Sequence, residues 1–308
     1  IMGVATYKDF WNNQASSPES AISAVDGSQS EEVVQHTGRW SAEQVRAALD
    51  VGPQDRVLEL GCGIGRIGRE LAPRCKHWTG VDISENMIHH AGERMQGLDN
   101  VSFHRLDRSS LDMLEDDSID KAYSIAVFCH MDKEDLFLYM LELNRVVRPG
   151  GTIFVETWNL AHPVGWRRWA YEPLVWSRAD QSQRKDVARN QFCTAEESEL
   201  YVTHAGFEPL ANFNQSQSVQ IIAGKQLGES QKTDLEAYIG KNRDKIAYSA
   251  EYAELFAQSV DVLFGKMPPQ DMLAYIDGLG DHPEARLFRP YILSLWQKNA
   301  PIWGDPPE

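Results

Sequence analysis

The sequence predicts an α/β protein whose mostly parallel sheet is covered by helices on both faces. Apolar strand-like runs alternate with amphipathic helical runs from residue 56 to residue 157, and this alternation is typical of βαβ units. Two further strand-like runs flank residues 212–214. We expect these two runs to form an antiparallel hairpin that closes the sheet.

The sequence predicts an irregular N-terminal arm, then a helix, then the alternating strands and helices of the core. Residues 12–30 are rich in Asn, Gln, Ser and Ala, which predicts a loop or loosely ordered arm. A helical stretch over 31–50 follows, interrupted near 36–38, with Ser41 as a new N-cap. The core then alternates through strand 57–60, helix 66–72, strand 77–82, helix 84–95, strand 101–106, strand 119–127, helix 133–147 and strand 152–157.

The end of the chain predicts further helices. Residues 247–264 and 285–298 each place apolar side chains on one helical face, which indicates a core or a dimer surface rather than a ligand site. Three parts are therefore expected: an N-terminal arm or lid over 1–40, a core over 41–227 with an insertion near 158–191, and a helical C-terminal extension over 228–308.

Composition narrows the classes of function. Acidic residues outnumber basic ones by 45 to 30, for a formal net charge of −15, which disfavours nucleic acid as a partner. No apolar run is long enough to span a membrane, and the first twelve residues lack signal-peptide features. The four cysteines show no metal-ligand spacing, so we expect reduced thiols, no metal and a cytoplasmic location.

The most informative motif is a glycine-rich turn after the first core strand. Gly61, Gly63 and Gly65 let the backbone approach a ligand closely, and Asp82 ends the next strand, where a carboxylate can bind a ribose diol. Residues 63–68 also fit the dinucleotide pattern G-x-G-x-x-G. Glu59 would repel a pyrophosphate but attract a cationic ligand.

The stretch Glu59-x-Gly61-x-Gly63-x-Gly65, followed by residues 80–84, resembles the class I S-adenosylmethionine (SAM)-dependent methyltransferases. The resemblance covers roughly residues 40–225 and implies a Rossmann-like, seven-stranded, mostly parallel sheet. It also implies SAM as the cofactor, S-adenosylhomocysteine (SAH) as its product, and cofactor contacts from Glu59, Gly61, Gly63, Gly65, Asp82, Ile83, Met87, Leu106 and Asp107. The alternatives are that the glycines serve only a tight turn and that Asp107 caps a turn.

His130 is the candidate catalytic residue. It follows the fourth strand, at the sheet edge where the methyl group is expected, and a histidine near its ordinary pKa is suited to removing a proton from a hydroxyl or amine. The alternative is a structural role in the wall of the cofactor site.

The insertion over 158–191 is locally basic and aromatic in an acidic protein. Aromatic rings stack on substrate rings and arginines bind carboxylate or phosphate, so this segment is expected to select the substrate. The candidate substrate-binding residues are Glu156, Trp166, Arg167, Arg168 and Trp169. The alternative is a packing insertion whose arginines are solvated.

The resulting function hypothesis is methyl transfer from SAM to a small polar metabolite, anionic or glycosidic, at oxygen or nitrogen. Three alternatives stay open: a protein or peptide methyltransferase that docks through its C-terminal helices, a nicotinamide-dependent oxidoreductase, and a non-catalytic SAM-binding subunit. The expected partners are a small-molecule substrate and a second copy bound through the C-terminal helices, without nucleic acid or membrane.

Overall fold

The computed structural model describes residues 7–177 and 190–307. Its centre is one sheet with the strand order β3-β2-β1-β4-β5-β8-β7, and the short β6 pairs with the end of β5. Strands β1 to β5 run parallel, whereas β8 is antiparallel to both β5 and β7. The strands are β1 (Arg56–Leu60), β2 (His77–Asp82), β3 (Val101–Arg105), β4 (Ile119–Ser124), β5 (Val147–Asn159), β6 (Phe192–Cys193), β7 (Glu208–Phe213) and β8 (Ser218–Gly224).

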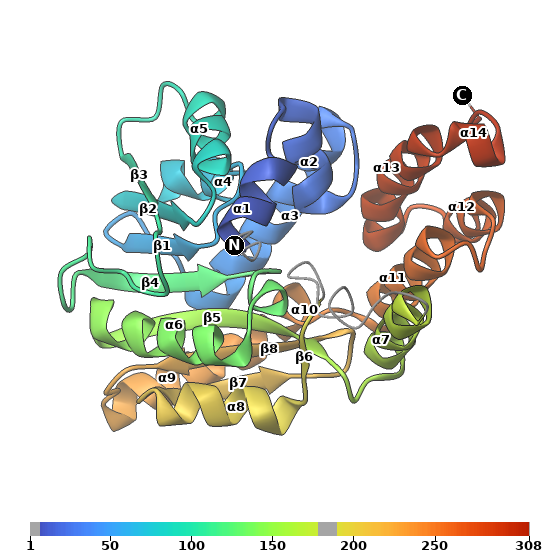
Figure 1. Cartoon of the computed structure of the whole chain (residues 1–308). Helices are drawn as coiled ribbons and strands as arrows, with labels where there is room; N and C mark the ends of the chain where they lie inside the picture. Colours follow the sequence, from blue (N-terminus) through green and yellow to red (C-terminus); the bar gives the residue numbers. More distant parts are fainter. Residues whose placement is uncertain (1–6, 178–189, 308) are drawn as a thin grey trace.

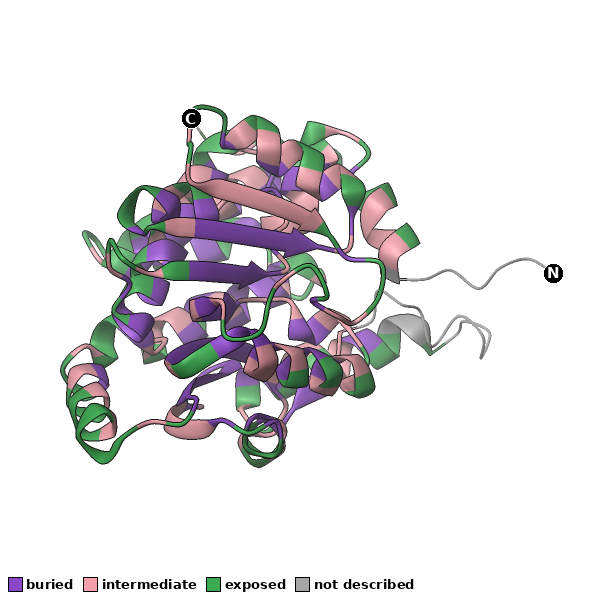
Figure 2. Cartoon of the chain, turned by 90° about the vertical axis from the view of Figure 1, so that its left-hand side faces the viewer, coloured by how far each residue is buried: buried purple, intermediate pink, exposed green. Residues whose placement is uncertain are grey.

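Helices cover both faces of this sheet, as the sequence predicts. One face packs against α6 and α8, and the other packs against α3, α4, α5, α9 and α10 (Figure 1). These helices are α3 (Glu31–Leu49), α4 (Gly68–Leu71), α5 (Glu85–Arg94), α6 (Lys133–Val146), α8 (Ala195–His204), α9 (Glu229–Lys241) and α10 (Arg243–Ile246). The central strands are buried while the edge strands β3 and β7 are mostly half-buried (Figure 2).

The prediction of a loop over 12–30 is wrong. Two helices, α1 (Tyr7–Gln14) and α2 (Pro18–Asp26), occupy most of it. Ser17 and Ser20 form a capping box, Pro18 takes the first helical position, and Gly27 ends α2 with φ 79°. The Pro and Gly that suggested a loop are the residues that start and stop this short helix.

The predicted break in the next helix is also wrong, because α3 runs without interruption from its N-cap at Ser30. Gly38 lies inside this helix, at a position where a Cβ would approach the carbonyl oxygen of Arg66 to 2.5 Å. Ser41 is not an N-cap: its hydroxyl accepts a hydrogen bond from Arg66 at 3.1 Å. The glycine therefore marks a close approach of α3 to the turn after β1.

The C-terminal helices pack into a small core of their own beside the sheet (Figure 1). They are α11 (Ala250–Leu263), α12 (Pro269–Gly278), α13 (Pro283–Lys298) and α14 (Ala300–Trp303). Helix α7 (Pro163–Trp176), from the predicted insertion, packs against α11, and α13 also contacts α3. Residues of α7, α11 and α13 meet residues of α1 and α2 at the carboxyl ends of the parallel strands.

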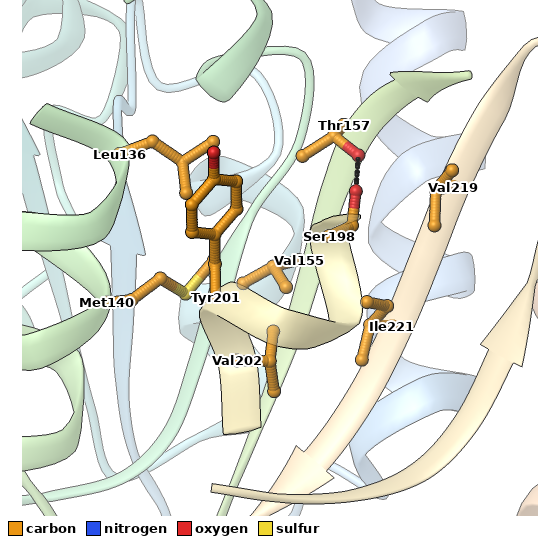
Figure 3. Close-up of a pocket in the computed structure, with 9 residues that line it drawn as sticks. All are labelled: Leu136, Met140, Val155, Thr157, Ser198, Tyr201, Val202, Val219 and Ile221. Atoms are coloured by element: carbon orange, nitrogen blue, oxygen red, sulfur yellow. Dashed lines mark hydrogen bonds between the residues drawn. The ribbon is translucent and has the colours of Figure 1, made fainter. Parts of the chain in front are cut away.

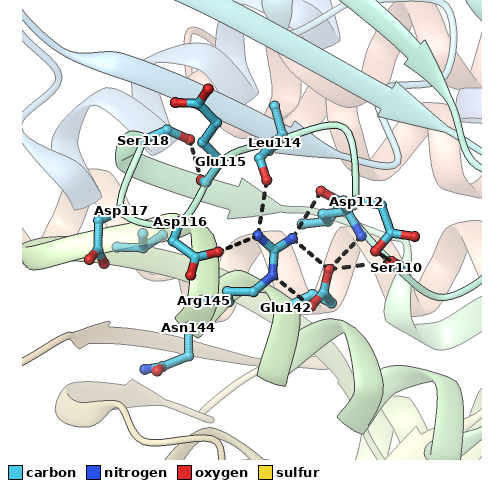
Figure 4. Close-up of polar contacts among 12 residues, drawn as sticks. Ser110, Asp112, Leu114, Glu115, Asp116, Asp117, Ser118, Glu142, Asn144 and Arg145 are labelled. Atoms are coloured by element: carbon cyan, nitrogen blue, oxygen red, sulfur yellow. Dashed lines mark hydrogen bonds and ion pairs between the residues drawn. The ribbon is translucent and has the colours of Figure 1, made fainter.

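Arg145 fixes the long connection between β3 and β4 (Figure 4). Its guanidinium donates to the carbonyl oxygens of Leu111 and Leu114 and pairs with Glu142 and Asp116. These contacts raise the pKa of Arg145, so its guanidinium stays protonated. The residue serves the fold rather than the site.

The apolar space between α6, α8 and the strands β5 and β8 is a packing void. Its volume is only ≈ 10 Å³, and the Thr157 and Ser198 hydroxyls bond at 2.7 Å along one side (Figure 3). A space of this size holds at most about one water molecule. It carries no ligand site.

Candidate functional site

The glycine-rich turn after β1 adopts backbone angles that suit glycine. Gly61 has φ 75° and Gly63 has φ 51°, in the left-handed region that other residues rarely adopt. A Cβ on Gly61 would also come within 2.4 Å of Val127. The backbone of the turn is therefore accessible to a ligand at the carboxyl ends of β1 and β4. The strand order reverses between these two strands, and α/β sheets bind their ligands at such a point.

Asp82 is tied to this turn. Its two carboxylate oxygens accept hydrogen bonds from the backbone nitrogens of Gly63 and Ser84, each at 2.9 Å. Burial raises the pKa of Asp82, while these backbone hydrogen bonds act in the opposite direction. Each oxygen keeps a second acceptor position for a ligand.

Glu59 lies in a buried chain of polar groups. Trp78 Nε1 donates to the hydroxyl of Tyr123 at 3.1 Å, and that hydroxyl donates to Oε2 of Glu59 at 2.6 Å. Burial is the largest effect on Glu59 and raises its pKa to about 8. A cation beside this carboxyl would favour its ionised form.

These groups open into one cavity of ≈ 620 Å³, a size typical of small-molecule sites. Its walls come from the turn after β1, the ends of β2 to β5, helix α7, and the helices at both ends of the chain. The residues from those two ends are Trp11, Ser23, Ala24, Val25, Asp26, Gly27, Phe256, Leu263, Tyr291, Leu295, Lys298 and Asn299.

Most of the predicted cofactor residues converge on this cavity: Glu59, Gly61, Gly63, Asp82, Ile83, Met87 and Leu106 line it. Two do not. A Cβ on Gly65 would meet Met95 and Ala91, so this glycine allows close packing against α5. Asp107 is exposed and pairs with Lys8 at 2.9 Å and Arg105 at 2.7 Å.

His130 lines the cavity in a short 3-10 turn, η2 (Phe128–His130). Its ring is 4.7 Å from that of Trp11, and within the described part of the chain its buried Nδ1 has no hydrogen-bond partner. Burial, with a smaller effect of the Arg168 charge, lowers its pKa to about 4. The ring is therefore neutral near pH 7, although the sequence led us to expect an ordinary pKa.

The predicted substrate residues separate into two groups. Arg168 lines the cavity together with Trp158, and its guanidinium lies 4.1 Å from the centre of the Trp158 ring. The other four do not line it. Arg167 pairs with Asp261 at 2.9 Å, and Glu156 accepts a hydrogen bond from Tyr248. Trp166 and Trp169 contact each other, and 54% and 37% of their surfaces are exposed.

Sequence reasoning missed several wall residues. Ala126 has a strained φ of 58° beside the turn, and such strain often lies at functional sites. Phe256, Leu263, Tyr291 and Leu295 belong to helices whose stripes were assigned to core or dimer surface, yet they also line the cavity. A helical period shows that these side chains share a face but does not show what that face meets.

Comparison with known proteins agrees with a cofactor site at the glycine turn. Residues 57–151, which hold the glycine turn and strands β1 to β4, fit a family model described as a methyltransferase domain. These residues form a class I SAM-dependent methyltransferase domain. The match favours SAM over a nicotinamide dinucleotide as the ligand of the glycine turn.

Relatives of this methyltransferase domain differ in what their names state. The chain is 35% identical over 122 residues to methyltransferase GfsG of Streptomyces halstedii, covering 38% of this chain and 43% of that protein. It is 31% identical over 116 residues to phosphoethanolamine N-methyltransferase 1 of Triticum aestivum, covering 37% and 23%. The chain thus spans less than half the length of these relatives, and ribosomal RNA methyltransferases match over similarly limited segments.

The fold has counterparts among solved structures. The N-methyltransferase NodS of Bradyrhizobium japonicum, solved with SAH, superposes with a TM-score of 0.50 at 17% identity, over 72% of this chain and all of that one. This likeness supports the Rossmann-like architecture of the methyltransferase domain. No described helix has the length and apolarity to cross a membrane, and the described residues hold no cluster of His, Cys, Asp and Glu suited to a metal.

Proposed function

We propose that this protein transfers the methyl group of SAM to an oxygen or nitrogen atom of a small polar metabolite, anionic or glycosidic in character. The observation that carries the proposal is the single cavity in which the glycine turn, Glu59 and Asp82 share walls with His130, Trp158 and Arg168. One space therefore holds groups suited to a cationic nucleoside and groups suited to a second molecule.

The cofactor half of the cavity fits SAM. Asp82 keeps acceptor positions for a ribose diol, and the apolar side chains of Ile83, Met87 and Leu106 suit the faces of an adenine ring. Glu59 suits the positive charge of the sulfonium or ammonium group.

Arg66 completes this half. It lines the same space and donates to the carbonyl of Thr37 and the hydroxyl of Ser41, each at 3.1 Å. A guanidinium held in this way can bind the methionyl carboxylate with its remaining donors.

SAM supplies a methyl group on a good leaving group, so the protein's task is to align the acceptor and exclude water. The acceptor's oxygen or nitrogen gains the methyl group and loses a proton. His130 lines the cavity and is neutral with an unpaired Nδ1, so we assign to it the role of accepting that proton. Residues of α2 and α13 line the cavity, and these helices are the ones that would exclude water from it.

Two other acceptors fit less well. The net charge of −15 opposes an RNA backbone, although some relatives are named as RNA methyltransferases. A peptide would need the C-terminal helices as an open docking surface, whereas their side chains contribute to the cavity wall. A dimer through these helices stays a prediction.

The test combines binding and turnover. Calorimetry should show that SAM and SAH bind the purified protein while NAD does not. Incubation with methyl-labelled SAM and a panel of small acceptors should then yield a labelled product. SAM binding without transfer to any small molecule, RNA or protein would favour the non-catalytic subunit.

A further inference from the structure

One cation in the cavity wall has a distant carboxylate neighbour but no hydrogen-bond partner for its Nε among the described residues. Arg168 lies on α7, lines the cavity, and has 19% of its side chain exposed. Within the described residues its buried Nε has no hydrogen-bond partner. Its nearest carboxylate oxygen, on Glu172, is 3.7 Å away, which is beyond hydrogen-bond length. Burial lowers the pKa of Arg168, which reflects the cost of holding this charge away from water.

The neighbours of Arg168 are already engaged. Glu172 accepts a hydrogen bond from Asn190 at 2.6 Å, so its carboxylate is shared. Trp158 holds the guanidinium from one face at 4.1 Å, and the ring of Trp158 packs edge-on against Phe192 and Phe256. The guanidinium is thus fixed in direction by stacking, and none of its donors makes a hydrogen bond to a described residue. A preorganised guanidinium of this kind binds an oxyanion well.

The other cations of the cavity are placed differently. Arg66 donates to the carbonyl of Thr37 and the hydroxyl of Ser41, and Lys298 is exposed and donates to the hydroxyl of Ser23 at 2.6 Å. The carboxylate of Asp26 accepts from the nitrogen of Ser28 and the hydroxyl of Thr37. Arg168 is therefore the lining cation, among the described residues, that a buried anion would satisfy most directly.

The other side chains of the cavity wall indicate what kind of molecule would carry this anion. Trp158, Phe256, Leu263 and Leu295 present apolar or aromatic surface to the cavity. A sugar needs many hydrogen-bonding groups along its length. Of these four side chains only the Trp158 indole can donate a hydrogen bond, and Tyr291 of α13 adds one hydroxyl. A ring or alkyl body instead gains from burial against it.

We propose, building on the proposed methyl transfer, that the acceptor is an amphiphile with a carboxylate or phosphate monoester on Arg168 and an apolar body against helices α11 and α13. The methylated oxygen or nitrogen lies at the other end of this molecule, toward His130 and the glycine turn. The C-terminal extension is then part of the acceptor site. The choice excludes the glycosidic acceptor that the sequence left open.

The experiment measures binding to the SAH-saturated protein with matched probes: phenylacetate and phenyl phosphate as anions, and phenylacetamide as the neutral analogue. Wild type should bind at least one anion on the order of 10- to 100-fold more tightly than the amide, because hydrogen bonds to charged groups are the strong ones. The better of the two anions distinguishes a carboxylate from a phosphate acceptor.

Variants at Arg168 and Arg167 test whether Arg168 causes the preference for an anion. Arg168→Gln should abolish the preference for the anion, and Arg168→Lys should keep part of it. Arg167→Gln is the matched comparison, since it removes the same charge from the neighbouring residue, which pairs with Asp261 instead. Circular dichroism and SAH affinity report whether each variant is folded.

The outcomes separate the two proposals. If SAH does not bind wild type, the proposed function falls and this inference falls with it. If SAH binds but wild type shows no preference for either anion, the inference alone is wrong. A preference that survives in Arg168→Gln, or disappears equally in Arg167→Gln, also overturns it.

Discussion

The hydroxyl of Tyr248 donates a hydrogen bond to Oε2 of Glu156 at 2.9 Å and thereby joins the segment that leads into α11 to the end of β5. The ring of Tyr248 also stacks on Tyr252 at 4.3 Å. Burial raises the pKa of Glu156 to about 7. A residue expected at the substrate therefore holds the extension against the sheet.

Tyr248→Phe should lower the free energy of unfolding by about 1–3 kcal/mol, because it leaves a buried carboxyl with one donor fewer. Urea denaturation of both proteins measures the difference. Tyr275→Phe is a suitable control, since the hydroxyl of Tyr275 bonds Glu251 on the surface. An equal effect of the two changes would show that the buried contact has no special weight.

The raised pKa of Glu59 predicts that SAM binding releases a proton. With a pKa of about 8 the free carboxyl is mostly protonated at pH 7, and a cation beside it stabilises the carboxylate. Roughly 0.5–1 proton should therefore leave on binding. SAM affinity should rise as pH increases toward 8 and level off above it.

Calorimetry in buffers of different ionisation enthalpy counts these protons. SAH, which lacks the sulfonium charge, should release fewer. Glu59→Gln should remove the effect, and a variant that still releases the wild-type number of protons would assign the titration to another group.

The fold was predictable where the signal is local. The alternation of periods over 57–157 and the hairpin at 208–224 both depend on residues close in sequence, and the structure confirms the order of elements. The short helix α2 was not predictable in the same way. Its Pro18 and Gly27 mark a loop as readily as the two ends of a helix.

The cofactor half of the site was easier to predict from the sequence than the substrate half, for the same reason. The predicted cofactor residues that reach the cavity come mainly from one continuous motif after β1 and β2. Trp158, Arg168, Phe256 and Tyr291 come from distant segments that meet only through tertiary packing. Composition indicated a basic, aromatic insertion, but residue type could not separate Arg168 from Arg167, since only the helix orientation does. The arginines at 178, 184 and 189, which add to the basic character of the insertion, lie outside the described residues.

Asp82 predicts separable effects on binding and folding. Asp82→Asn keeps one oxygen but loses the charge, and SAM affinity should fall on the order of 10- to 100-fold if this carboxylate binds the ribose. Asp82→Ala should in addition leave the nitrogens of Gly63 and Ser84 without their partner. That loss should lower the free energy of unfolding by about 1–3 kcal/mol. Titration calorimetry and urea denaturation measure the two quantities, and unchanged affinity in folded Asp82→Asn would remove Asp82 from the cofactor site.

His130 also predicts how stability depends on pH. Its pKa is about 4 in the folded protein and near 6.5 when unfolded, so the unfolded state binds the proton more readily. The folded protein should therefore lose up to about 3 kcal/mol as pH falls from 6.5 to 4. His130→Leu, which cannot titrate, should show a smaller loss over that range in urea denaturation. Equal slopes for the two proteins would contradict the lowered pKa.

The same residue predicts the pH dependence of catalysis. If His130 accepts the proton, His130→Ala should reduce kcat on the order of 10²- to 10⁴-fold and leave SAM affinity nearly unchanged. The wild-type kcat/KM should rise with pH through about 4, because the ring must be neutral to act as a base. An anion on Arg168 would offset the charge that helps to hold this pKa down, so the corresponding limb in kcat should lie at higher pH. Loss of SAM affinity in parallel with rate would instead place His130 in the wall of the cofactor site.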